Sequence, residues 1–194
     1  MNPKQSVREY LDGFHKLAER LEAGAGGHTL PLEEGIMQAI EIVRPLRHSK
    51  GKLFFVGNGG SAGIVSHLAV DFWKMGGMRS MVFSDPAFLT CISNDYGYAH
   101  VYEKPIESFT DQGDVLIAIS SSGQSENILR AAKAAQKGGA KVITLSGFEP
   151  KNPLRALGDV NFYVPSHAYN YVETLHMLLC VSILDCMLAT QNPH

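Results

Sequence analysis

The sequence has few cysteines, and none of them stands in a paired motif. Among its 194 residues there are three, Cys91, Cys180 and Cys186, an odd number at wide spacing with no C-x-x-C. A disulfide framework or a zinc ribbon needs more cysteines at closer, matched spacing, so both are excluded. Because the neighbouring residues in the sequence are apolar, we expect buried free thiols in a reducing compartment.

An excess of charge of one sign is also missing. The 17 Lys and Arg residues stand against 19 Asp and Glu residues, which gives a formal net charge of −2. A dedicated nucleic-acid binder usually carries a basic stripe. Since the sequence has no such stripe, we expect no direct binding of nucleic acid.

Long apolar runs are absent as well, because no uncharged apolar stretch reaches the ~20 residues of a membrane span. The most apolar segment, residues 172–188, is interrupted by Glu173, His176 and Asp185, which predicts a buried helix rather than an anchor. The first ten residues are polar and charged, unlike a signal peptide. These features predict a cytoplasmic protein that does not bind membranes.

No linker, low-complexity tract or block of charge divides the chain, and its length suits one α/β domain, residues 1–194. We expect residues 1–50 to form a helical extension, because apolar residues recur every three or four positions over residues 7–21 and 32–46. Residues 24–27, which include three glycines, would end the first of these helices. Residues 51–194 would form the α/β core, with a C-terminal helix at a subunit interface.

Five short apolar runs predict a parallel β-sheet. They are continuous rather than alternating, and helical patterns separate them, which is typical of strands covered on both faces. The predicted fold is a three-layer α/β sandwich with a five-stranded parallel sheet, helices on both faces and additional N-terminal helices. The strands are expected at residues 52–56, 79–83, 115–119, 141–145 and 160–164.

Two loops rich in glycine and serine follow the first and third of these strands, and each opens a predicted helix. In open α/β sheets ligands bind at this carboxyl end, and the first turn of a helix offers free N–H groups to an anion. Helix capping explains one serine, whereas a phosphate or sugar-phosphate site explains all of them. The second loop places four hydroxyls in six residues: Ser120, Ser121, Ser122 and Ser125.

The first loop also fits another kind of site. Residues 57–62 match the dinucleotide fingerprint G-x-G-x-x-A, and Asp85 follows the next predicted strand, where it would hold an adenosine ribose. A dinucleotide-dependent enzyme is therefore one alternative, but it leaves the serines of the second loop unexplained. The motif G-x-x-x-x-G-K-[ST] is absent, which argues against nucleoside triphosphate hydrolysis of that type.

Three motifs in order resemble the SIS (sugar isomerase) domain family, and within it the phosphoheptose isomerase branch. They are residues 57–61 (Gly-Asn-Gly-Gly-Ser), 94–97 (Asn-Asp-Tyr-Gly) and 119–125 (Ile-Ser-Ser-Ser-Gly-Gln-Ser). The resemblance covers almost the whole chain, and it implies a flavodoxin-like sandwich and a homotetramer with sites at subunit interfaces. It also implies that the four serines hold a phosphate. Around the sugar it places Asn58, Gly59, Gly60, Ser61, Asn94 and Asp95.

The resemblance further implies isomerisation of sedoheptulose 7-phosphate, often with a zinc ion. The family motif has a metal-binding His at position 67, which the chain keeps, and Glu, Gln and His at positions where the chain has Asp71, Glu173 and Val181. Aldose–ketose isomerisation moves a proton between C1 and C2 through an enediol, and it needs a base. We expect Asp71 to be that base, with His67, four residues earlier on the same helix face, as its partner.

Val181 can neither bind a metal nor transfer a proton. Another residue must therefore supply the metal ligand or proton-transfer group that the family motif has at this position. His176 is one candidate, because Glu173 and His176 lie three residues apart and can converge. The predicted zinc site is then His67, Asp71, Glu173 and His176, and Glu173 is also expected to line the substrate site. Family members with the usual ligands also carry a His at position 176, which favours a site-lining or hydrogen-bonded role for it.

Two leading interpretations remain at this point. The first is a sugar-phosphate isomerase that acts on a phosphorylated ketose. The second is a non-catalytic SIS module that binds a phosphosugar or a protein partner such as a replication initiator protein, as some members of the family do. The valine at position 181 favours the second interpretation, and the presence of Asp71 with His67 favours the first.

Overall fold

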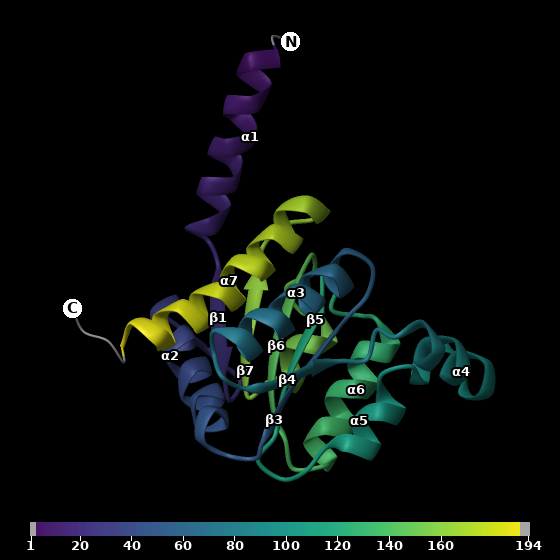
Figure 1. Ribbon diagram of the computed structural model, residues 1–194. Coiled ribbons are helices and arrows are strands. Elements are labelled where there is room, and N and C mark those ends of the chain that lie inside the picture. The colour runs from purple at the N-terminus through teal and green to yellow at the C-terminus, as the bar shows by residue number, and fades with distance from the viewer. Residues whose placement is uncertain (1–2, 191–194) are drawn as a thin grey trace.

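The structure of the protein is a computed structural model, which describes residues 3–190. A central sheet runs through the molecule (Figure 1), and its seven strands follow the order β2-β1-β7-β6-β5-β3-β4. The five strands from β7 to β4 are mutually parallel, as the five apolar runs predict. Their bounds are β3 Lys52–Gly57, β4 Arg79–Val82, β5 Val115–Ser120, β6 Lys141–Gly147 and β7 Val160–Val164.

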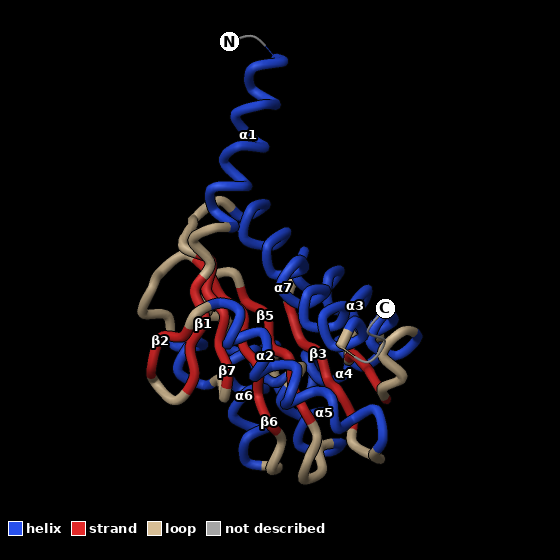
Figure 2. Tube along the Cα trace, turned by 90° about the vertical axis from the view of Figure 1, so that its left-hand side faces the viewer, coloured by secondary structure: helices blue, strands red, loops and turns tan. Residues whose placement is uncertain are grey.

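The two remaining strands come from the segment between the predicted N-terminal helices. β1 (Glu22–Ala25) pairs antiparallel with β7, and β2 (His28–Leu30) pairs antiparallel with β1 (Figure 2). Gly26 and Gly27 make the turn with φ angles of 58° and 82°, which glycine adopts without strain. Residues 24–27 therefore belong to a hairpin of residues 22–30 instead of ending a helix, and the sheet has seven strands rather than five.

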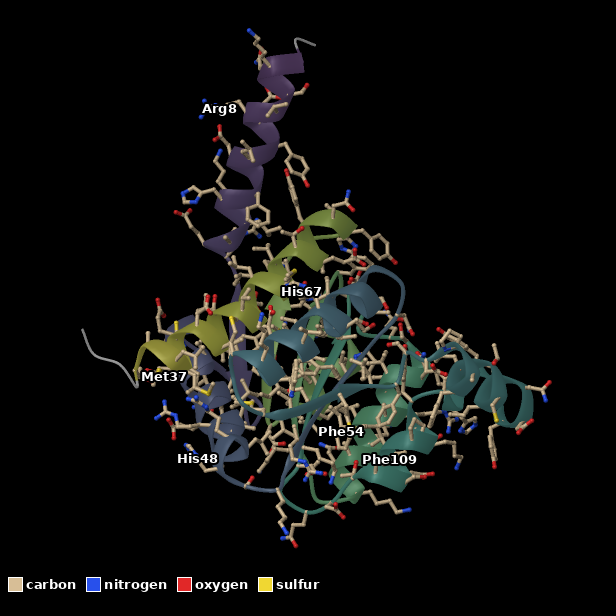
Figure 3. The ribbon with its side chains drawn as sticks, in the orientation of Figure 1. Arg8, Met37, His48, Phe54, His67 and Phe109 are labelled. Atoms are coloured by element: carbon tan, nitrogen blue, oxygen red, sulfur yellow. The ribbon has the colours of Figure 1, made fainter. Side chains whose placement is uncertain are left out.

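Helices cover both faces of the sheet and enclose two apolar cores. Leu53 and Phe55 of β3 belong to one core, and Phe54 and Val56 belong to the other (Phe54 is labelled in Figure 3). Because both faces of the strand are buried, it has a continuous apolar sequence. The first core contains α2 (Leu32–Val43), α3 (Gly60–Lys74) and α7 (Tyr169–Ala189); the second contains α5 (Glu103–Phe109) and α6 (Glu126–Lys137).

One helix stands away from this three-layer body (Figures 1 and 2), and another lies at its side with Ile92 buried in the second core. α1 (Pro3–Ala18) projects beyond the sheet, and its Val7 and Leu11 side chains are 61% and 56% exposed. Its last turn is attached through Leu17, which packs in a small buried cluster with Val172 and Leu175 of α7. α4 (Pro86–Tyr96) lies at the side of the molecule beyond α5 and α6. The 3-10 helices are η1 Arg44–His48, η2 Tyr98–His100 and η3 Pro153–Leu157.

α7 is the helix predicted from the apolar segment near the C-terminus. Within residues 3–190 it is the one helix long and apolar enough to cross a membrane, and 44% of that stretch is buried inside the fold. Leu179 and Ile183 pack into the first core, against α2, α3 and the sheet. This packing is typical of a core helix in a globular protein.

The three cysteines do not share one environment. Cys180 is buried on α7, whereas Cys91 and Cys186 are exposed, so the expectation of three buried thiols is wrong for two of them. Burial raises the pKa of the Cys180 thiol to about 12. This thiol is therefore an apolar core group that stays protonated.

Candidate functional site

A pocket of about 250 Å³ opens at the carboxyl ends of β3 and β5. Residues 57–61, here called the glycine loop, and residues 120–125, the serine loop, contribute most of its wall. This edge of a parallel sheet is where ligands bind in open α/β folds. The residues that line the pocket are Asn58, Gly59, Gly60, Ser61, Ile119, Ser120, Ser121, Ser122, Ser125, Tyr169 and Glu173.

The serine loop turns tightly at the end of β5. The Gly123 N–H donates to the Ser120 carbonyl at 2.9 Å, and Gly123 has a φ of 64°. The Ser120 hydroxyl lies 3.2 Å from that of Ser125 and 3.5 Å from that of Ser122. Ser125 occupies the N-cap position of α6, yet its side chain makes no capping hydrogen bond. Helix capping therefore does not explain this hydroxyl.

Ser121 has a hydroxyl without a partner. The residue is only 6% exposed, and its Oγ makes no hydrogen bond with any residue of the described range 3–190. A buried polar group left unpaired costs on the order of 1–3 kcal/mol. Phosphate oxygens accept hydrogen bonds, and the N-terminus of α6 favours negative charge. Because neither Lys nor Arg lines the pocket, an anion here would be held by neutral donors.

Asn58 lines the pocket while its amide is engaged inside the chain. Its Nδ2 donates to Asn127 Oδ1 at 2.9 Å, and its Oδ1 accepts from Asn127 Nδ2 at 2.8 Å. The Tyr98 hydroxyl also donates to Asn58 Oδ1, at 3.2 Å. Asn58 thus connects the glycine loop to α6 and to η2. Its predicted place beside the sugar is compatible with the pocket lining, but its side chain has a structural role in this chain.

Glu173 lies directly over the first turn of α3. A Cβ built on Gly60 would lie 2.6 Å from Glu173 Oε1 and closer still to Oε2, so glycine leaves room for the carboxylate. Glu173 also lines a second hollow of about 280 Å³ beside the first one, with Ile64, Asn170 and Met177 among its walls. Together with Gly60, Glu173 therefore lines both hollows. Its carboxylate makes no hydrogen bond or ion pair with any residue that the structure describes.

His67 and Asp71 form the pair that their spacing predicts. His67 Nε2 lies 3.1 Å from Asp71 Oδ2, and their side chains are 57% and 22% exposed. Figure 3 labels His67 on α3, which packs against α7. Neither residue lines the pocket. At 1.5 Å per residue, His67 and Asp71 lie about 10 and 16 Å beyond Gly60 along the helix. The chain by itself does not bring this pair to the serine loop.

His176 does not join the predicted zinc site. It is fully buried, and its Nε2 lies 3.0 Å from the Ser146 carbonyl oxygen. Burial lowers the pKa of its imidazole to about 4. Within residues 3–190 no three His, Cys, Asp or Glu side chains are placed to share a metal ion. The donors of one chain therefore do not fit a zinc ion, and no chemical step is derived through one.

Other predicted site residues lie elsewhere in this chain. Asn94 and Asp95 are in the last turn of α4, exposed, with Asn94 Nδ2 donating to Asp95 Oδ1 at 2.8 Å, and they do not line the pocket. The carboxylate of Asp85 accepts hydrogen bonds from the N–H groups of the first turn of α4. Since this carboxylate caps a helix, the dinucleotide interpretation loses its ribose ligand.

The structure connects three further residues to the site. Asn127 and Tyr98 hold Asn58, and Tyr169 lines the pocket at the start of α7. A signal existed only for Tyr169, which begins the helix that carries Glu173. Asn127 is a polar residue on the buried face of an amphipathic helix, and its partner lies 69 positions away.

Comparison with known proteins places the chain in a family. The SIS domain family matches residues 10–147. The phosphoheptose isomerase of Helicobacter pylori (strain P12) is 33% identical over 186 residues, which covers 93% of this chain and 92% of the relative. That of Edwardsiella ictaluri (strain 93-146) is 36% identical over 148 residues, covering 73% of this chain and 76% of the relative.

A solved structure has the same fold over nearly the full chain. The phosphoheptose isomerase from Neisseria gonorrhoeae superposes with a TM-score of 0.84 at 30% identity, covering 96% of this chain and 98% of that one. The pocket between the glycine and serine loops thus lies in a chain whose fold matches that enzyme over 96% of its length. On the family match and these relatives, the protein belongs to the SIS domain family, with phosphoheptose isomerases among its relatives.

Proposed function

We propose that the protein is a sugar-phosphate isomerase that interconverts a phosphorylated ketose and an aldose, with sedoheptulose 7-phosphate as the ketose. The observation that carries the proposal is the serine loop. Its hydroxyls line a pocket at the start of α6, Ser121 Oγ is buried without a partner, and Ser125 does not cap the helix. The names of the relatives, which are phosphoheptose isomerases, support the substrate class.

The chemistry that this function requires is a proton transfer between C1 and C2. In the proposal Asp71 takes the proton and His67, whose Nε2 lies 3.1 Å from Asp71 Oδ2, orients the carboxylate. A phosphate in the serine loop would anchor the sugar and hold its carbon chain near the reacting groups. Asp71 is one methylene shorter than the glutamate of the family motif, so its carboxylate reaches less far from α3. The packing of subunits in the oligomer would have to bring the substrate closer to it.

The proposal includes a homotetramer in the cytoplasm. His67 and Asp71 lie about 10 and 16 Å along α3 from the pocket, so a second copy of the chain must bring its pocket to the pair. Large apolar side chains are exposed on α1 and α3, among them Val7, Leu11 and Trp73. Exposed apolar groups of this kind are typical of surfaces that pack against another chain. A zinc ion remains a prediction for the assembled protein.

The test is turnover by the pure protein. It is incubated with sedoheptulose 7-phosphate, with and without zinc, and the product is followed by NMR. Conversion is expected in the wild type and in Ser182→Ala, which removes a hydroxyl on α7 that donates to the Leu178 carbonyl. It is expected to be lost in the double variant S120A/S121A, because the phosphate loses two donors.

Absence of conversion across a panel of ketose phosphates would overturn the isomerase proposal. In that case a rise in melting temperature with the same sugar phosphates would identify a non-catalytic binding module, since a ligand that binds only the folded state stabilises it. The observation that favours this second candidate is Val181. It is half-buried on α7 and can neither bind a metal nor transfer a proton.

A further inference from the structure

The proposed isomerisation needs a second proton transfer in addition to the one between the carbons. When C1 loses its proton to a base, the enediol must also move a proton from O1 to O2 before the aldehyde forms. Val181 stands on α7 where the family motif has a histidine, and a valine side chain can neither accept nor donate a proton. The residue that carries the second proton must therefore lie elsewhere.

His176, the nearest histidine on α7, is not that residue. It is fully buried, and its Nε2 is used by the Ser146 carbonyl. It lines neither the serine pocket nor the adjoining hollow. An imidazole without access to the pocket cannot exchange protons with a sugar bound there.

Glu173 has the access that His176 lacks. It is the one carboxylate that lines the pocket, and it also lines the adjoining hollow, so a sugar that extends from the serine loop passes beside it. No residue in the described part of the chain donates to it or neutralises it. Gly60 leaves the space over the α3 N-terminus in which the carboxylate sits. A half-buried acid with both oxygens free is able to accept and return a proton.

We propose that Glu173 is a catalytic residue, the group that carries the proton between O1 and O2 of the substrate. The inference rests on the proposed isomerase function. Asp71 takes the C1 proton as the C1=C2 double bond forms and the C2=O π electrons move to O2. Glu173 takes the O1 proton and delivers it to O2. The O1 lone pair then re-forms C1=O, and C2 receives the proton from Asp71. One C–H and one O–H bond break, one of each forms, and both carboxylates return to their starting state.

The experiment separates the two proton transfers in D₂O. The wild type, Glu173→Gln, Glu173→Asp and Asp71→Asn are incubated with sedoheptulose 7-phosphate, and NMR follows both aldose formation and loss of the C1 proton signal. Asp185→Asn is the matched control, because it makes the same carboxylate-to-amide change at an exposed position on the same helix. Thermal unfolding of each variant checks that it is folded.

For Glu173→Gln we expect kcat to fall at least ~100-fold, the size typical of a lost acid–base group, with KM within about threefold. Deuterium should still enter C1 faster than aldose forms, since Asp71 is intact. Glu173→Asp should retain part of the activity, Asp71→Asn should lose exchange and conversion together, and Asp185→Asn should match the wild type.

Conversion by Glu173→Gln within about threefold of the wild type would overturn the assignment while leaving the isomerase function in place. A loss confined to KM, or equal losses of exchange and conversion, would also overturn it and indicate a binding role. A wild type without turnover would overturn the isomerase function itself, and the assignment with it.

Discussion

Asn58 and Asn127 exchange a reciprocal pair of amide hydrogen bonds, at 2.9 and 2.8 Å, that connects the two loops of the site. Asn58 belongs to the glycine loop, and Asn127 lies in the first turn of α6, immediately after the serine loop. Asn127 is 3% exposed, so the pair is shielded from water on one side. The relative position of the phosphate-binding hydroxyls and the start of α3 therefore depends on two amides from distant parts of the chain.

Replacing Asn127 with alanine should weaken both the fold and the site. The half-buried amide of Asn58 would lose its two hydrogen bonds to Asn127, each worth about 0.5–1.5 kcal/mol of the free energy of unfolding. The glycine loop would also lose its position relative to the serine loop, so KM for the sugar phosphate should rise. Urea unfolding and steady-state kinetics measure the two effects. Gln136→Ala removes one exposed hydrogen bond on the same helix and should leave KM unchanged; equal effects of the two variants would contradict the role of the pair.

Gly60→Ala should displace the Glu173 carboxylate. The new methyl group would collide with both oxygens of Glu173, which must then leave its place over α3. Since the obstructing atoms are the end of a flexible side chain, stability should change little while turnover falls. Gly63→Ala in the same helix is the control, because its Cβ meets nothing within 4 Å and alanine favours a helix by up to about 1 kcal/mol. Equal turnover of the two variants would show that the position of Glu173 is unimportant.

The buried His176 should make stability depend on pH in the acid range. Burial lowers the pKa of this imidazole from 6.5 to about 4 in the folded chain. Between these two values the unfolded chain binds a proton that the folded chain excludes, so the free energy of unfolding falls as pH falls. This contribution is fully present above pH 6.5, and about 2 kcal/mol of it should be lost between pH 7 and pH 5.

The measurement for His176 is urea unfolding at several pH values in the wild type and in His176→Gln. Glutamine can still donate to the Ser146 carbonyl, but it does not titrate. The variant should therefore show a shallower decline in stability from pH 7 to pH 5, the other groups contributing equally to both proteins. Parallel curves for the two proteins would mean that His176 takes up its proton in the folded state.

Two inactive variants should complement each other if the pair and the pocket act across subunits. Asp71→Asn spoils the proton-transfer pair, and S120A/S121A spoils the phosphate site, while each variant keeps the part that the other lacks. After subunit exchange in a 1:1 mixture, random pairing should restore about a quarter of the sites. The mixture is assayed with sedoheptulose 7-phosphate. An inactive mixture with proven subunit exchange would show that pocket and pair do not combine between chains.

The sequence predicts the five parallel strands because each is buried on both faces, and such strands are continuous apolar runs such as residues 115–119. It does not predict the hairpin at residues 22–30. β1 has the sequence Glu-Ala-Gly-Ala, with no β-branched or aromatic residue, and its strand geometry comes from pairing with β7 at the open edge of the sheet. Local propensity gives no sign of a pairing with a strand about 140 positions away.

For the site, the local sequence alone determines the two loops at the ends of β3 and β5, because strand, turn and helix start lie next to one another in the chain. The spacing of four residues likewise determines that His67 and Asp71 face each other on one helix. Only the tertiary structure decided that His176 is buried against β6, that Glu173 lies over Gly60 and that Asn127 holds Asn58. These are contacts between elements far apart in the sequence. They depend on how α6 and α7 pack on the sheet, and apolar periodicity indicates which face of a helix is buried but not which distant residue that face contacts.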